Sequence, residues 1–141
     1  MKRITAIALA ATVALGGSAA VATSASAKDN ASRDRGTCAG TVGNAWVSKV
    51  KSKDSGIRVD FWVKTKQTGQ TWSYTLKQNG TVILTADRVT RVHDNNSQDN
   101  TGHVAEVKWR KQAANLAGTD TFEMTATRGT DICTSTVAFA G

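Results

Sequence analysis

The sequence predicts an all-β fold, an antiparallel β-sandwich or barrel built from seven or more short strands. Apolar residues recur at every second position in one segment after another, which is the period of a half-buried strand. Turn residues separate these segments every ten or so positions, and no long stretch has the 3.6-residue period of an amphipathic helix. The chain of 141 residues, 40% of them hydrophobic, suffices for one small domain and is unlike a disordered protein.

Residues 1–27 have the pattern of a secretory signal peptide. Lys2 and Arg3 precede an apolar run of twelve residues that ends at Leu15, and small residues follow up to Ala27. Twelve helical residues rise only about 18 Å, less than the roughly 30 Å of a bilayer core, so we expect no membrane span. Cleavage after Ala27 leaves 16 basic and 11 acidic residues, a net charge of +5. No lipoprotein motif precedes Cys38, so we expect no lipid anchor. We therefore expect a basic protein that is secreted, extracellular or cell-wall associated.

Export accounts for the two cysteines, Cys38 and Cys133. In an oxidising compartment, two thiols with no third competitor are expected to form one disulfide. The two positions are 95 residues apart, and closing a loop of that length stabilises a fold by about 4 to 5 kcal/mol at most. Metal-binding thiols would need further ligands at short spacing, and the sequence does not contain them.

The mature chain divides into a flexible polar tail over 28–36 and a single domain over 37–141. The tail is charged and has no apolar period. The domain begins with a weak strand pattern around Trp46 and Val50, and a clear one follows from Ile57 to Lys64, where the odd positions are apolar. The inward-facing sets expected after it are Trp72, Tyr74, Leu76; Val82, Leu84, Ala86; Ala105, Val107, Trp109; Phe122, Met124, Ala126; and Cys133, Ser135, Val137, Phe139.

The turn around Asn79 and Gly80 sets the register of the hairpin that contains it. A two-residue loop places Val82 and Leu84 on the polar face. A three-residue loop, with Gly80 at positive φ, places Val82 opposite Leu76 and keeps both apolar side chains inside, so we predict this register. Gly129 is predicted to serve a similar turn, and residues 111–118 are predicted to form one helical turn.

The segment from Leu116 to Met124 resembles the corner of immunoglobulin-like domains, where a Leu and, four residues later, an Asp precede an alternating strand. Met124 stands where that corner has Tyr, and Ala126 where a Cys follows, so the antibody-type core disulfide is excluded. With the terminal cysteine pair and the stretches GIRVDFWVKTKQTGQTWSYTLKQNG and GTDTFEMTATRGTDICTSTV, the chain resembles small secreted immunoglobulin-like proteins of actinobacteria. The resemblance implies a secreted immunoglobulin-like sandwich of about seven to nine strands, and it implies no catalytic residues.

The sequence favours a binding protein over an enzyme, and we expect no cofactor. His93 and His103 are the only histidines, and Ser and Thr are scattered along the strands without a triad pattern. The acidic residues are spread singly, unlike a glycosidase pair, and no glycine-rich phosphate loop opens a helix.

A basic, Trp-containing sheet face is the strongest candidate binding surface. Alternation places basic residues on the outward side of two strands around Trp62, and such a surface suits an anionic wall or extracellular polymer. The alternative is a solvated face on which a loop or the Lys and Arg stems cover Trp62. No nucleic-acid motif is present. The residues assigned to this surface are Lys49, Lys51, Lys53, Arg58, Trp62 and Lys64.

Two other binding classes remain open. The protein could be a secreted inhibitor or effector that presents a loop to another extracellular protein, although the expected disulfide lies at the chain ends and braces no such loop. It could also carry a small ligand in a cleft of the sandwich. The sequence predicts no particular oligomeric state.

The polar loop from His93 to His103 is a candidate metal site. If the flanking segments pair so that His93 lies opposite His103, two imidazoles together with Asp94 or Asp99 could bind zinc or copper. The same loop lacks the Gly and the final Glu of a calcium-binding loop. The alternative is a solvated loop with ordinary hairpin-end histidines.

Overall fold

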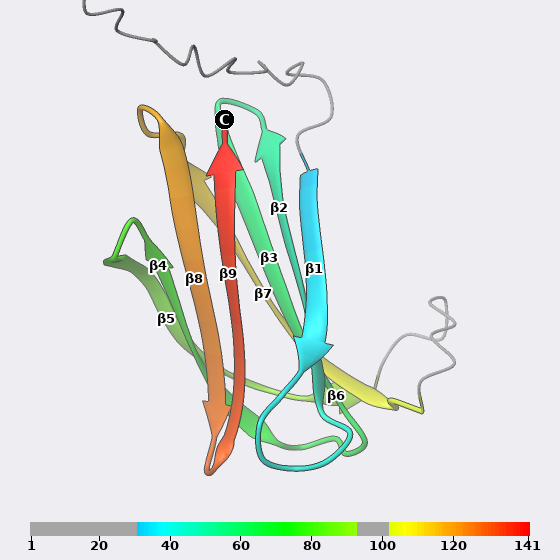
Figure 1. The fold of residues 1–141 in the computed structure, drawn as a ribbon. Coiled ribbons are helices and arrows are strands. Elements are labelled where there is room, and N and C mark those ends of the chain that lie inside the picture. The colour runs from blue at the N-terminus through cyan, green and yellow to red at the C-terminus, as the bar shows by residue number, and fades with distance from the viewer. Residues whose placement is uncertain (1–30, 93–101) are drawn as a thin grey trace, which may run out of the picture.

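The computed structural model describes residues 31–92 and 102–141, which form two antiparallel β-sheets (Figure 1). These residues contain nine strands and no helix, which confirms the predicted all-β class. The predicted signal peptide, residues 1–27, lies outside the described residues. The strands are β1 (Ala31–Thr37), β2 (Ala45–Lys53), β3 (Gly56–Thr65), β4 (Thr71–Gln78), β5 (Thr81–Val89), β6 (Arg91–Val92), β7 (Ala105–Ala114), β8 (Thr119–Arg128) and β9 (Asp131–Ala140).

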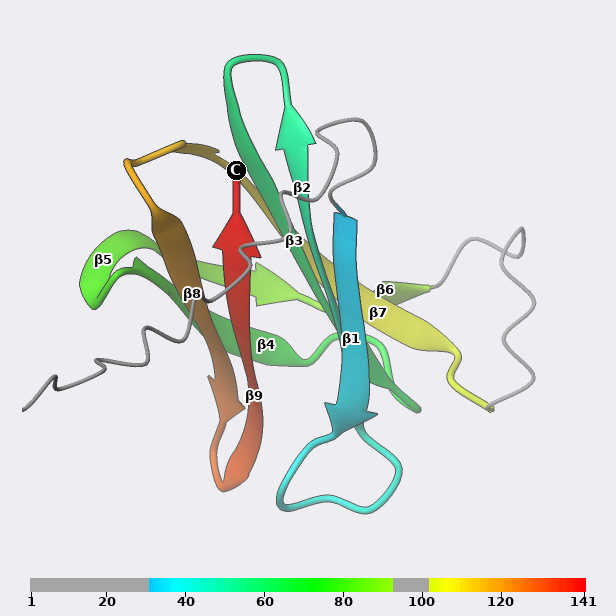
Figure 2. The same cartoon turned by 45° about the horizontal axis from the view of Figure 1, so that its top comes forward.

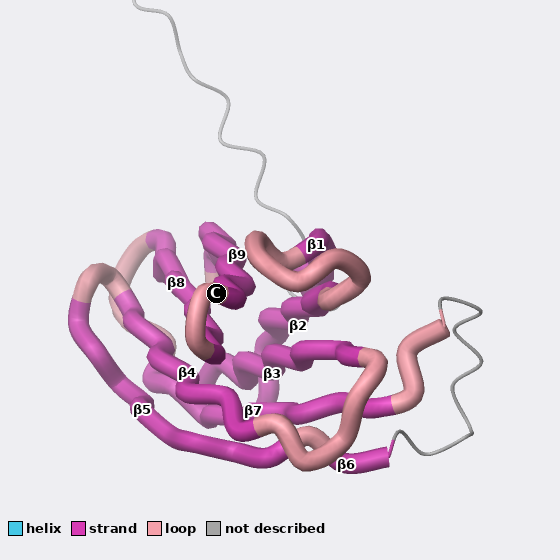
Figure 3. The backbone as a smooth tube through the Cα atoms, turned by 90° about the horizontal axis from the view of Figure 1, so that it is seen from below, coloured by secondary structure: helices cyan, strands magenta, loops and turns pink. Residues whose placement is uncertain are grey.

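One sheet has five strands in the order β1-β2-β3-β7-β6, and the other has four in the order β5-β4-β8-β9. The chain passes from the second sheet to the first at Thr90, so that β5 runs on into β6 beside β7 (Figure 3). On the opposite side of the molecule, β9 lies next to β1 (Figure 2). Within the described residues, no helix is long and apolar enough to cross a membrane.

The core lies between the two sheets and is built by the predicted alternation. Every inward-facing set predicted for β2, β3, β4, β7, β8 and β9 is buried. Aromatic rings meet at its centre, where Phe61 stacks on Tyr74 with ring centroids 5.5 Å apart and Tyr74 stacks on Trp109 at 4.8 Å. Stacked pairs of this kind add about 0.5 to 1.5 kcal/mol each to the burial of their surface.

The predicted register of the β4–β5 hairpin is wrong. Asn79 and Gly80 both have positive φ, 50° and 81°, and form a two-residue turn that pairs Gln78 with Thr81. A bulge then shifts the pairing, so that Leu84 rather than Val82 lies opposite Leu76. Leu84 and Ala86 pack against the core as predicted, whereas Val82 is 52% exposed. The extra residue that the prediction placed in the loop is inside the strand.

Residues 31–36 are not the flexible tail that the sequence predicted. They belong to β1, which pairs with β2 along its whole length, from Ala31 opposite Lys51 to Thr37 opposite Ala45. Gly36 lies against the indole of Trp46, where a Cβ atom would come within 2.7 Å of the ring. The folded domain therefore begins before the predicted boundary at residue 37.

The helical turn predicted over 111–118 is absent. β7 continues to Ala114 because its partner strand β3 extends to Gly56, which pairs with Ala114. Gly129 has positive φ and lies in the turn between β8 and β9, as predicted.

The cysteine prediction is confirmed by a disulfide between Cys38 and Cys133, which ties the loop between β1 and β2 to β9. The same loop is held by backbone pairing of Ala39 with Ile132. The buried carboxylate of Asp131 accepts hydrogen bonds from the Thr41 amide at 2.6 Å and from Asn44 Nδ2 at 3.3 Å. The disulfide is thus one of several links between the N-terminal loop and β9.

The corner between β7 and β8 is organised by Asp120. Its buried carboxylate accepts hydrogen bonds from Gln78 Nε2 at 2.8 Å, Asn79 Nδ2 at 3.0 Å and the Leu116 amide at 3.1 Å. The residue therefore joins the β7–β8 loop to the end of β4.

We expect Asp120→Ala to lower the free energy of unfolding by about 1 to 3 kcal/mol, because the substitution leaves buried donors without an acceptor. Urea denaturation measures the change. Asp87→Ala, at an exposed position, serves as the control and is expected to change stability by about 0.5 kcal/mol or less. Equal effects of the two substitutions would contradict this role for Asp120.

Candidate functional site

The six residues of the predicted polymer-binding surface lie on the outer face of the five-stranded sheet. In β2, Trp46, Ser48 and Val50 are buried, so the odd positions between and after them point outward. The pairing of β2 with β3 sets Lys49 opposite Asp60, Lys51 opposite Arg58 and Val47 opposite Trp62. Lys53 and Lys64 continue the same two rows at their ends.

Four further cations from β1 and β7 lie on this face. Arg33 pairs with Lys49 and Arg35 with Val47, while Lys108 lies opposite Trp62 and Arg110 opposite Asp60. Alternation with the buried Val107 and Trp109 could have revealed Lys108 and Arg110. We call the nine basic residues together the basic face: Arg33, Arg35, Lys49, Lys51, Lys53, Arg58, Lys64, Lys108 and Arg110.

Two carboxylates, Asp60 and Glu106, share the rows of the basic face. Asp60 is only 1% exposed and lies at the centre of the sheet. It accepts a hydrogen bond from Arg110 Nε at 2.6 Å and one from Arg58 Nε at 2.9 Å. A buried carboxylate requires such partners. Asp60 in turn holds the guanidinium groups of Arg58 on β3 and Arg110 on β7 in place. Burial, and to a smaller extent the charge of Asp60, raises the pKa of the Tyr74 phenol in the core beneath.

Trp62 is half-buried and is covered by Lys108. The Lys108 Nζ atom lies 4.4 Å from the centroid of the indole ring, a cation–π distance. Partial burial lowers the pKa of Lys108; Asp60 opposes this shift, and the neighbouring Arg110 and Arg58 add to it. This arrangement corresponds to the alternative in which a basic stem covers Trp62. Lys108 therefore occupies a position over the ring that a stacking ligand would take.

A shallow hollow of about 380 Å³ opens at one end of the basic face. Small side chains, those of Ala45 and Val47, form part of its lining. Arg33, Arg35, Lys64 and His103 contribute the basic and imidazole groups around them. The hollow lies where β1, β2 and β3 run side by side, and a chain-like ligand could enter it from the open sheet surface.

The predicted metal site falls mostly outside the described residues, which exclude His93, Asp94 and Asp99. His103 is described, and its Nε2 donates to the Gly43 carbonyl oxygen at 2.6 Å. The observed pairs, Arg91 with Glu106 and Val92 with Ala105, differ by one residue from the register on which the prediction relied. Over residues 31–92 and 102–141, no three His, Cys, Asp or Glu side chains are grouped to hold a metal ion.

No family model matches the chain, and no similar curated protein is found for it.

Proposed function

We propose that the chain is a secreted, non-enzymatic binding protein whose basic face engages an anionic polymer of the cell wall or the extracellular medium. The observation that carries the proposal is the basic face itself, in which nine cations on four adjacent strands share rows with two carboxylates. This excess of positive charge creates a potential that attracts an extended polyanion along the sheet. Binding then releases the counterions of the polymer, which favours association at low salt.

Two observations support export. The disulfide between Cys38 and Cys133 is of the kind that persists in oxidising compartments, and the first 27 residues have the composition of a signal peptide. A protein delivered outside the cell with a positive charge meets anionic wall polymers first.

We further propose that the fold is immunoglobulin-like. Taking β2 as strand A, the order β2-β3-β7-β6 follows the A-B-E-D sheet of that fold, and β5-β4-β8-β9 follows its C′-C-F-G sheet. On this assignment β1 is an additional edge strand. Asp120 lies at the start of strand F, where the corner of such domains is found. The addition of β1 widens the sheet that carries the basic face.

The proposal is tested by measuring retention of the mature protein on purified bacterial cell wall, with an uncharged polysaccharide as the control matrix. We expect retention on the wall at low salt, its loss as salt rises towards about 0.5 M, and no retention on the control. Retention that does not change with salt would contradict the proposal, as would equal retention on both matrices.

A further inference from the structure

At the junction between the two sheets, one further cation, Arg88, lies beside two residues of the basic face, Lys108 and Arg110. β5 leaves β4 at Val89, and the chain joins the other sheet as β6 two residues later. Thr90, between them, is buried and well anchored. Its Oγ1 donates to the Gln67 carbonyl at 3.0 Å and accepts from the Gln70 amide at 3.0 Å. Because Thr90 is anchored, the backbone at Arg88, two residues earlier, is held beside β7.

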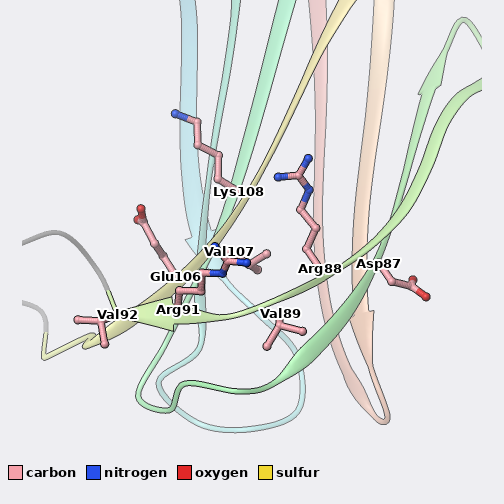
Figure 4. Close-up of a pocket in the computed structure, with 8 residues that line it drawn as sticks. All are labelled: Asp87, Arg88, Val89, Arg91, Val92, Glu106, Val107 and Lys108. Atoms are coloured by element: carbon pink, nitrogen blue, oxygen red, sulfur yellow. The ribbon is translucent and has the colours of Figure 1, made fainter.

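A hollow of about 300 Å³ between β5 and β7 is lined by three residues, Arg88, Lys108 and Arg110. A larger hollow of about 550 Å³ shares Arg88 and Lys108 and adds Arg91 and Glu106. In Figure 4, the side chains of Arg88 and Lys108 extend to the same side of their strands, whereas the carboxylate of Asp87 points away from them. The smaller hollow is thus lined only by basic residues, which come from strands of both sheets.

The three cations differ in the contacts that they make within the protein. Arg110 bonds Asp60 through its Nε, and Lys108 lies over Trp62. The exposed side chain of Arg88 makes no ion pair with any residue of the described ranges. Within these ranges, its guanidinium is thus the one of the three cations that contacts neither a carboxylate nor an aromatic ring.

We propose that this hollow is a phosphate-binding subsite, and that the polymer engaged by the basic face carries phosphodiester groups rather than carboxylates. The inference rests on the proposed function. A phosphodiester presents tetrahedral oxygens that accept hydrogen bonds from several directions, which suits an Arg fork and a Lys point charge converging from two strands. A carboxylate can accept from two guanidinium groups, as Asp60 does, but its acceptor directions lie close to one plane, so it suits donors that converge from different directions less well. Lys108 links the subsite to the basic face, because it lies opposite Trp62 on that face.

The test compares binding of the mature protein to inorganic polyphosphate and to polygalacturonate at equal charge concentration and equal salt. We expect wild type to bind polyphosphate about tenfold more tightly. Arg88→Gln is expected to weaken polyphosphate binding about tenfold and polygalacturonate binding less than about twofold. Lys77→Gln, which removes one charge from β4 of the same sheet, outside the hollow, is the matched control and is expected to weaken neither binding by more than about twofold.

Each outcome separates the subsite from the broader proposal. If both polymers bind with equal affinity and in a salt-sensitive way, the phosphate subsite is contradicted. Equal weakening of both by Arg88→Gln also contradicts it. Neither result contradicts polymer binding by the basic face. Absence of binding to either polymer at low salt overturns the proposed function itself. Inorganic phosphate serves as the competitor, and if it displaces polyphosphate at an equal concentration of phosphate groups, the ligand is free phosphate and the polymer assignment fails.

Discussion

Replacing both Cys38 and Cys133 with alanine is expected to lower the free energy of unfolding by about 2 to 5 kcal/mol. The disulfide closes a loop of 95 residues, so it removes much of the conformational freedom of the unfolded chain. Cys133 is fully buried in the hydrophobic core, and truncation there also removes packing. A loss of this size is a large share of the stability of one small domain.

Urea denaturation of the oxidised wild type, the reduced wild type and the double-alanine protein measures this effect. We expect the reduced and double-alanine proteins to unfold at similar, lower urea concentrations. The loop also has bonds of its own, from Thr41 and Asn44 to Asp131. A loss below about 0.5 kcal/mol would mean that these contacts hold the loop without the disulfide.

Replacing Lys49, Lys51 and Lys53 together with glutamine is expected to weaken binding to an anionic polymer about 100-fold at low salt. The three residues project from one strand, and a Lys near a dense negative charge contributes about 1 kcal/mol. A total of about 3 kcal/mol corresponds to about two orders of magnitude in Kd. Within the described structure, one of the three lysines makes an ion pair: Lys53 Nζ lies 3.3 Å from the Asp54 carboxylate. Both groups are exposed, so a polymer can compete for this lysine.

The matched control lowers the net charge by the same amount on the opposite sheet. Thr71, Thr85 and Thr134 are exposed on β4, β5 and β9, and their replacement with glutamate adds three negative charges and so also lowers the net charge by three units. We expect the control to bind within about threefold of wild type, because these positions lie outside the basic face. An equal loss in both variants would show that overall charge, and not this face, governs binding.

The core could be predicted from the sequence because side-chain alternation is a local property of a strand. Ile57, Val59, Phe61 and Val63 are buried as their spacing predicts. The β4–β5 register could not be predicted, because a bulge inside β5 takes up one residue that the sequence pattern assigns to the loop. β1 was missed since it lies at a sheet edge and is held by backbone pairing, without an apolar row of its own.

The basic face could be predicted only in part. Lys49, Lys51 and Arg58 followed from alternation within neighbouring strands, but Arg33 and Arg35 were assigned to a tail. The central role of Asp60 depends on Arg110, which is 50 residues away in the chain. The hollow beside Lys108 depends on where β5 crosses between the sheets, and no local pattern encodes that crossing.

The most direct test of polymer binding by the basic face is the dependence of Kd on salt concentration, measured with inorganic polyphosphate for wild type and for the triple glutamine variant. Each cation that neutralises a phosphate contributes just under one unit to the slope of log Kd against log salt. We expect a steep slope for wild type and a slope shallower by about two to three units for the variant. Identical slopes for the two proteins would contradict the assignment of binding to the basic face.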